Sequence, residues 1–193
     1  MPLLAEEPMV FPPDLLRAAS DDLDDRPWLV VHTRARTEKT LARHLYSAGI
    51  PYFLPLSRRQ WRNQGRLHTS FLPLFPGYVF LKADNDQRLM ALESRVIAQI
   101  LKAPDPQQLE QDLLGVFRLI ESGAEITPES GYIPGERVIV EDGSFAGVEG
   151  VVVRYATATR LVIQVRLINQ AIAVDLEPCR VRPVTARHAQ RAY

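Results

Sequence analysis

The chain has 193 residues, carries no net formal charge at pH 7, and is 46% hydrophobic. This length allows one large or two small domains, and the composition is that of a folded globular protein. No apolar stretch reaches the ~20 residues of a membrane-spanning helix, and the acidic N-terminus lacks the features of a signal peptide. The single cysteine, Cys179, excludes an internal disulfide framework, so we expect a cytoplasmic protein.

The charged residues are sorted along the chain. Residues 1–25 carry seven acids and one base, whereas residues 28–66 carry eight Lys or Arg and the single acid Glu38. A local basic block inside a neutral protein indicates a small surface that faces a polyanion.

The first 26 residues, acidic and proline-bearing, predict a flexible leader in which Leu15–Ala19 could form a short helix. Residues 27–121 predict an α+β domain, an α/β sandwich in which helices flank an antiparallel sheet. Its expected elements, in chain order, are a strand at Trp28–Thr33, a helix at Glu38–Ala48, a strand at Tyr52–Leu56, a basic hairpin at Arg58–His68 with its tip near Gln64-Gly65, a strand at 71–83, a helix at Gln87–Ser94, a strand at Val96–Leu101 and a helix at Pro106–Ile120.

The first predicted helix has two distinct faces. Leu41 and Leu45 form the apolar stripe that would face the core. At 100° per residue, Arg36, Lys39 and Arg43 fall within about 60° of one another on the opposite side. This basic face is either a solvated helix surface or a nucleic-acid contact, and the shortage of acids around it favours nucleic acid.

The strand that follows Gly77 is apolar on both sides. Tyr78 and Phe80 point one way, and Val79 and Leu81 point the other. Such a strand is either buried on both faces or docked to a partner on one of them. Each aromatic could therefore belong to the core or to a docking patch, and we expect at least two to form the patch.

The composition and the predicted secondary structure change beyond the last predicted helix. Residues 122–133, with two Gly and one Pro, predict a linker. Residues 134–184 hold short Val- and Ile-rich runs between turns, which is typical of a small β-barrel, and residues 185–193 would be a tail.

Several motifs give this chain a resemblance to a known family. The segment Asp142–Val152 combines an Asp-Gly turn, the aromatic Phe145 and two further glycines, and with Pro134–Val138 it resembles the SH3-like KOW barrel of the NusG family. Trp28–Thr33, Glu38-Lys39 and Phe75–Val79 resemble that family's N-terminal (NGN) domain, in the same order and spacing. The resemblance covers residues 27–184.

The resemblance implies a transcription elongation or antitermination factor that docks on the clamp helices of RNA polymerase, contacts the non-template DNA strand and modulates pausing. It would act as a monomer, without a membrane partner. The implied polymerase-binding residues are His32, Phe75, Pro76, Tyr78 and Phe80. The implied DNA-binding residues are Arg34, Arg36, Lys39, Arg43 and His44. Phe145 and Val148, in the KOW loop, would bind Rho or a small-subunit ribosomal protein.

Two kinds of family member come into question. Gly77 matches the housekeeping NusG type, whereas Leu167–Ile172 and the acidic leader are more similar to specialised, RfaH-like members. We favour a specialised member. RfaH can switch its C-terminal domain between a helical hairpin and a barrel, but the Val and Ile content of this chain favours a resident barrel.

Other classes of protein are less well supported. The sequence has no phosphate-binding Gly-Lys loop, no Cys/His metal spacing and no recognisable nucleophile-base pair, so we expect neither an enzyme nor a cofactor or metal site. A ribosome- or RNA-associated KOW protein remains the non-enzymatic alternative.

Overall fold

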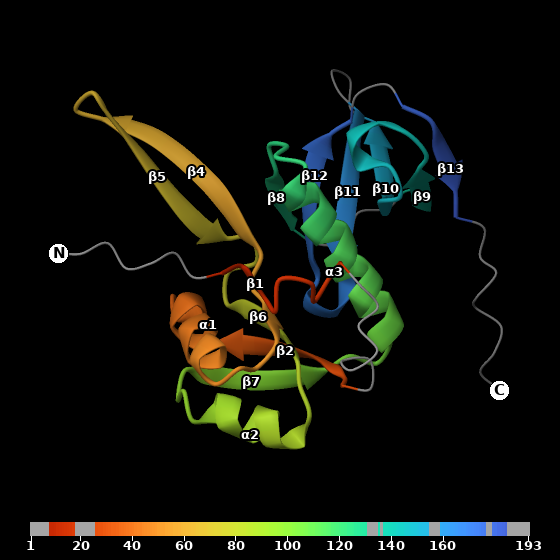
Figure 1. Ribbon diagram of the computed structural model, residues 1–193. Helices are drawn as coiled ribbons and strands as arrows, with labels where there is room; N and C mark the ends of the chain where they lie inside the picture. Colours follow the sequence, from red (N-terminus) through yellow and green to blue (C-terminus); the bar gives the residue numbers. More distant parts are fainter. Residues whose placement is uncertain are drawn as a thin grey trace, which may run out of the picture. The chain divides into compact units, whose positions relative to one another are not determined.

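A computed structural model of the chain describes residues 8–17, 26–130, 135, 137–154, 159–176 and 179–184. The chain divides into two compact units, Met1–Glu110 and Gln111–Tyr193 (Figure 1). The predicted fold class is confirmed: the described residues form an α+β structure with antiparallel sheets and few helices. None of the helices within these ranges is long and apolar enough to cross a membrane.

The first unit is built on a five-stranded antiparallel sheet with the strand order β1-β3-β6-β2-β7. Apolar residues of α1 and α2 pack against Val31, Val79 and Leu81, so both helices cover the same face of the sheet. The elements are β1 (Val10–Phe11), β2 (Trp28–Thr33), α1 (Glu38–Ser47), β3 (Tyr52–Phe53), β6 (Tyr78–Lys82), α2 (Asn85–Leu92) and β7 (Ile97–Lys102).

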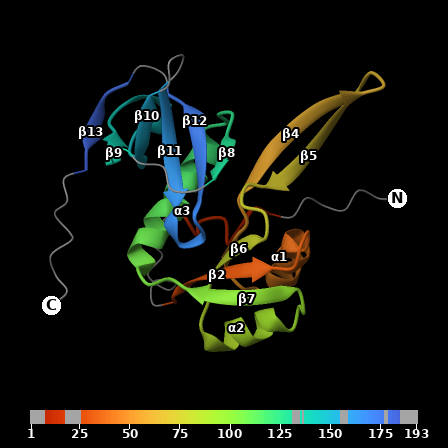
Figure 2. The same ribbon diagram turned by 180° about the vertical axis from the view of Figure 1, so that it is seen from behind.

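The basic hairpin is confirmed as a separate two-stranded ribbon of β4 (Leu56–Asn63) and β5 (Arg66–Pro73). It extends away from the five-stranded sheet of its unit (Figure 1, Figure 2). Gln64 and Gly65, at φ 49° and 77°, make its two-residue turn, and positive φ at both central residues matches the natural twist of a hairpin.

The prediction of a single strand over residues 71–83 is wrong. The hairpin takes residues up to Pro73, and a turn from Leu74 to Gly77 separates it from β6. Gly77 adopts φ 86°. This positive φ interrupts the extended backbone, and glycine adopts it readily because it has no Cβ.

The leader is also more ordered than its composition predicts. Val10 and Phe11 pair with Phe53 and Tyr52 in β1, and Leu15 and Leu16 are buried. Burial of these apolar side chains contributes favourable free energy, which the acidic composition of the segment as a whole conceals. Residues 1–7 and 18–25 lie outside the described residues.

Helix α3 (Pro106–Glu121) begins in the first unit and continues into the second. In the first unit, Glu110 accepts hydrogen bonds from the Trp28 indole at 3.2 Å and the buried Lys82 ammonium at 3.3 Å. In the second unit, Gly115 lies so close to Ile163 that a Cβ on it would come within 3.2 Å of the isoleucine side chain. The glycine therefore lets α3 pack closely on β11.

The second unit is a six-stranded antiparallel sheet in the order β13-β9-β10-β11-β12-β8. Alternating apolar residues such as Leu161, Ile163 and Val165 fill its core, so the Val- and Ile-rich runs form strands as predicted. The strands are β8 (Thr127–Ser130), β9 (Arg137–Val140), β10 (Glu149–Arg154), β11 (Thr159–Val165), β12 (Gln170–Asp175) and β13 (Val181–Pro183).

The predicted linker is only partly a linker. Thr127–Ser130 forms β8, which pairs with β12 from Gln170 to Ala173. This pairing gives the backbone groups of β8 hydrogen-bond partners that an extended linker would find only in water. The predicted tail, 185–193, lies outside the described residues.

Candidate protein and nucleic-acid interfaces

Two of the five residues predicted to dock on polymerase are buried. Phe75 and Phe80 are 1% and 0% exposed. Phe80 packs edge-on against Phe75 with ring centroids 6.1 Å apart, and its centroid lies 6.3 Å from that of Phe53. Because β6 is paired with β3 on one side and β2 on the other, Phe80 sits in the middle of the sheet. The prediction that Phe75 and Phe80 are surface contacts is wrong.

The end of the same sheet face is accessible. Tyr78 and His32 are half-buried cross-strand partners whose ring centroids lie 5.0 Å apart at an interplanar angle of 35°. Pro76, in the turn before them, is exposed. We call His32, Pro76 and Tyr78 the aromatic corner. The rings of His32 and Tyr78 leave part of their surface open to solvent, next to the exposed Pro76.

The aromatic corner is held in place through Gly77. Its N–H donates to the Glu38 carboxylate at 2.7 Å, and its carbonyl accepts from the Thr33 N–H at 2.8 Å. A Cβ on Gly77 would lie 3.3 Å from the His32 ring. Glu38 is only 7% exposed, so this carboxylate joins the start of α1 to the corner. Glu38 was noted in the sequence as the single acid of a basic block, but no role at the site was assigned to it.

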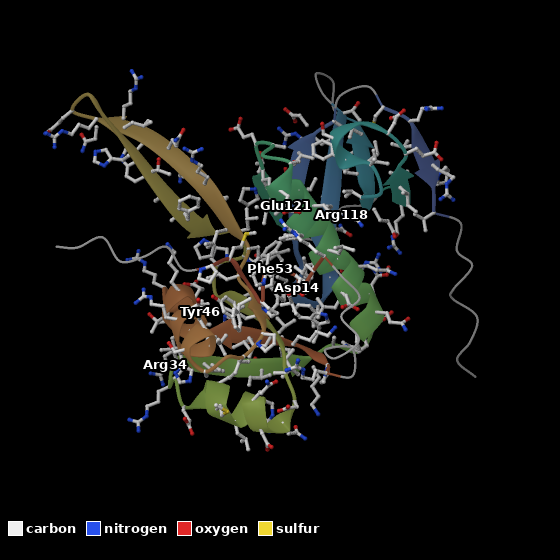
Figure 3. All side chains as sticks on the ribbon, in the orientation of Figure 1. Asp14, Arg34, Tyr46, Phe53, Arg118 and Glu121 are labelled. Atoms are coloured by element: carbon white, nitrogen blue, oxygen red, sulfur yellow. The ribbon has the colours of Figure 1, made fainter. Side chains whose placement is uncertain are left out.

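The basic residues at the start of α1 depend on a tightly bonded turn. The Arg34 carbonyl accepts hydrogen bonds from Thr33 Oγ1 at 3.0 Å, Thr37 Oγ1 at 2.8 Å and the Thr37 N–H at 3.2 Å. Arg34 and Arg36 are exposed, and the labelled Arg34 lies beside α1 (Figure 3). Arg36 precedes the helix and has φ 61°, so the helical-wheel argument that grouped it with the residues of α1 is wrong.

The other predicted DNA-binding residues lie on α1 itself. Lys39 is half-buried and Arg43 is exposed. His44 is half-buried, and its Nε2 lies 2.9 Å from the Met90 carbonyl oxygen. That bond ties α1 to α2 and occupies one of the two ring nitrogens that could contact DNA.

The fold brings a further cation to this surface. The Arg34 N–H donates to the Val96 carbonyl at 2.8 Å, which places the loop before β7 beside the Arg34 turn. Arg95 in that loop is exposed and adopts φ 59°. We call Arg34, Arg36, Lys39, Arg43 and Arg95 the basic cluster. Sequence reasoning missed Arg95 because the hydrogen bond that brings the two loops together joins distant parts of the chain.

The two residues predicted to bind a partner in the second unit differ in exposure. Phe145 is half-buried, in a short 3-10 turn (Gly143–Phe145). Val148 is 1% exposed, and its carbonyl accepts from the Val140 N–H at 3.0 Å. Val148 thus extends the pairing of β9 with β10 and belongs to the core, so the prediction that it contacts a partner is wrong.

An ion pair anchors the loop that carries Phe145. The Arg180 Nε donates to Asp142 Oδ2 at 2.9 Å, and the Arg180 backbone N–H donates to Oδ1 at the same distance. The hydrogen bond from the guanidinium, followed by that from the backbone, lowers the pKa of Asp142 below its ordinary value. Burial raises the pKa of the adjacent Cys179 thiol, which disfavours its reactive thiolate form. Within the ranges described, no three His, Cys, Asp or Glu side chains gather in a way that could hold a metal ion.

Comparisons with known protein sequences point to one family. The family model "Transcription termination factor nusG" matches residues 26–128, more than half of the chain. The transcription termination/antitermination protein NusG of Pseudomonas aeruginosa is 29% identical over 175 residues, which cover 81% of this chain and 98% of that protein.

Two solved structures are similar at 16% identity. One, titled "Domain interaction in Thermotoga maritima NusG", has a TM-score of 0.46 and covers 84% of this chain and 99% of its own. The other, a crystal structure of an MjSpt4:Spt5 complex, has a TM-score of 0.27, with coverages of 82% and 98%. The assignment rests on the family model, which identifies a transcription factor. The chain belongs to the NusG family.

Proposed function

We propose that this protein is a transcription elongation and antitermination factor that binds RNA polymerase, at its clamp helices, through the aromatic corner. The observation that carries the proposal is the half-exposed His32–Tyr78 pair at the open end of an otherwise buried sheet face. Each aromatic buried on docking contributes about 1–3 kcal/mol. Because Glu38 and the turn at Gly77 already fix the corner, little conformational entropy is lost on binding.

The polymerase contact is tested by measuring binding of the purified protein to core RNA polymerase. Tyr78→Ala and His32→Ala should each weaken binding by roughly 5- to 150-fold, the range expected for loss of one anchor. Leu89→Ala, at an exposed apolar residue of α2, is the matched control and should bind like the wild type. Equal affinities for all four proteins would contradict the proposal. Co-sedimentation with ribosomes that does not depend on Tyr78 would instead favour the ribosome-associated alternative.

The basic cluster is proposed to contact the non-template DNA strand on the transcribing polymerase. Lys and Arg contacts to phosphates supply affinity that does not depend on base sequence and falls with salt. Arg36→Glu combined with Arg43→Glu should weaken capture of that strand, most visibly at low ionic strength. Arg95→Glu should add to the loss. Unchanged capture at low salt would contradict this assignment.

We further propose that the protein is a specialised, RfaH-like member of the family. The similarity of Leu167–Ile172 to such members supports this. Elongation by purified polymerase, on templates with and without candidate upstream elements, is the test. An effect on pausing that needs an element supports specialisation, and an equal effect on all templates indicates the housekeeping type.

The second unit is proposed to be a KOW module that recruits Rho or a small-subunit ribosomal protein through Phe145. The half-exposed ring lies in a loop fixed by the Asp142–Arg180 pair. Phe145→Ala should abolish retention of the purified partner on the immobilised protein without changing the thermal stability of the second unit. Retention by the variant would contradict the proposal.

A further inference from the structure

The β4–β5 hairpin has features that the proposed contacts do not use. Its strands and turn, residues 56–73, contain four arginines and no Asp or Glu. Most of its side chains are exposed, and nitrogen-bearing side chains are seen along it (Figure 3). Because these arginines belong to a mostly exposed hairpin with no acidic residue on it, the hairpin has a surface suited to a negatively charged ligand.

The strand register sorts the hairpin residues onto two faces. Trp61 pairs with His68, and the flanking same-face pairs are Arg59 with Ser70 and Asn63 with Arg66. Same-face neighbours on a strand lie two residues apart, about 7 Å. One arginine therefore flanks the aromatic pair toward the base of the hairpin and the other toward its tip. The opposite face carries Arg58 and Arg62.

The aromatic pair is already ordered. The ring centroids of Trp61 and His68 lie 5.5 Å apart and the rings are nearly parallel, at 17°. Trp61 nevertheless remains 47% exposed. The imidazole holds the indole in one orientation and leaves ring surface open to solvent, so a ligand that stacks on it need not pay for ordering the side chain.

We propose that this face of the hairpin binds single-stranded nucleic acid, with a base stacked on Trp61 and phosphates contacted by Arg59 and Arg66. An exposed aromatic flanked by cations is the combination that non-sequence-specific single-strand sites use, because every base has a flat face and every linkage has a charge. In a duplex the bases are stacked on one another and could not reach the indole. The site is separate from the aromatic corner and needs no polymerase, so it stands or fails independently of the proposed function.

The test measures binding of the full-length protein, without polymerase, to a fluorescein-labelled 12-nucleotide DNA strand of mixed sequence, to the same sequence as RNA, and to the DNA duplex. All variants carry Arg34→Glu and Arg36→Glu, which weaken the basic cluster, so that the hairpin is measured alone. Trp61→Ala should weaken single-strand binding by roughly 5- to 150-fold, the loss expected for one stacked base. Trp61→Phe should restore part of it, which separates lost stacking from a misfolded hairpin.

The arginines are tested by the salt dependence of binding. Arg59→Gln with Arg66→Gln should reduce the slope of log K against log salt by about 1.4, because about 0.7 is lost per phosphate contact with a single strand. The matched control is Arg58→Gln with Arg62→Gln on the opposite face, which should change the slope by less than half as much. The intrinsic fluorescence of Trp61 should also be quenched by the single strands, whereas the buried Trp28 should not respond.

Three results would overturn the proposal. They are unchanged single-strand affinity in Trp61→Ala, equal losses from the two arginine pairs, and duplex binding as tight as single-strand binding with no quenching. The first two would mean that the hairpin acts only as a diffuse positive charge. Binding of either DNA or RNA single strands supports the proposal, and the ratio of the two affinities indicates which one the site recognises in the cell.

Discussion

Glu38 is the residue whose replacement tests the reasoning about the site most directly. Its buried carboxylate accepts the Gly77 N–H at 2.7 Å, at the N-terminus of α1. Glu38→Ala would remove the acceptor and leave that N–H without this partner. Glu38→Gln would keep an acceptor oxygen but remove the charge.

The expected loss of stability follows from two contributions. A hydrogen bond to a charged group is worth about 1.5–3 kcal/mol, and an acidic residue in the first turn of a helix adds about 0.3–1 kcal/mol through the helix dipole. Glu38→Ala should therefore lower the free energy of unfolding of the first unit by about 2–3 kcal/mol, and Glu38→Gln by about half as much. With a urea m-value of about 1–3 kcal/mol/M, the Ala variant should shift the unfolding midpoint by roughly 0.7–3 M.

The assay is urea unfolding followed by the fluorescence of Trp28, which is buried in β2 of the same unit, in a Trp61→Phe background. Glu93→Ala, at an exposed acid beyond the end of α2, is the control and should leave the midpoint nearly unchanged. Polymerase binding should weaken in Glu38→Ala as well, because the Gly77 turn positions Tyr78. A Glu38→Ala midpoint within 0.2 M of the wild type would refute the argument that this bond fixes the aromatic corner.

Three further predictions follow from single contacts. Gly77→Ala should cost more stability than Gly49→Ala, because both glycines have positive φ but only the Cβ at 77 would meet a neighbouring side chain. The backbone strain of positive φ costs about 1–2 kcal/mol at either position. A smaller loss for Gly77→Ala than for Gly49→Ala in thermal unfolding would contradict the close contact between Gly77 and the His32 ring. Val148→Ala should destabilise the second unit by about 1–3 kcal/mol by leaving a cavity in its core. An unchanged free energy of unfolding in chemical denaturation would contradict its assignment to the core. The folded-state pKa of Asp142 lies below the ordinary 3.8, so the stabilisation from its ion pair is present above that value and is lost as the pH falls through the folded pKa. Arg180→Ala should bring the pKa of Asp142 back toward 3.8 in an NMR titration. The same Asp142 pKa in the wild type and the variant would rule out the ion pair in solution.

Local signals in the sequence were sufficient for most of the individual elements. The apolar spacing of Leu41 and Leu45 predicted α1, and Gln64-Gly65 between two runs of strand-forming residues predicted the hairpin and its tip. These features depend on neighbours within one turn of helix or one turn of chain, so the sequence carries them directly. The same holds for the charge of the hairpin and of the α1 region.

The boundaries that failed were set by pairing between distant segments. Residues 10–11 became a strand because they reach β3, and residues 127–130 became one because they reach β12. Val10 and Phe11 favour strands but form too short a run to predict one, and residues 127–130 contain Pro128, which strands disfavour. The hydrogen-bond partners of both segments come from elsewhere in the chain.

The sequence by itself determined which residues are apolar, aromatic or charged, and which face of a strand or helix each of them shares. Only the tertiary structure decided that Phe80 and Val148 belong to the core whereas Tyr78 remains accessible. It also brought Glu38 to Gly77 and Arg95 to the Arg34 turn. The reason is physical. The face on which a side chain lies is set by the spacing of neighbouring residues along a helix or strand, but its burial and its hydrogen-bond partners depend on which remote segments the fold packs against it.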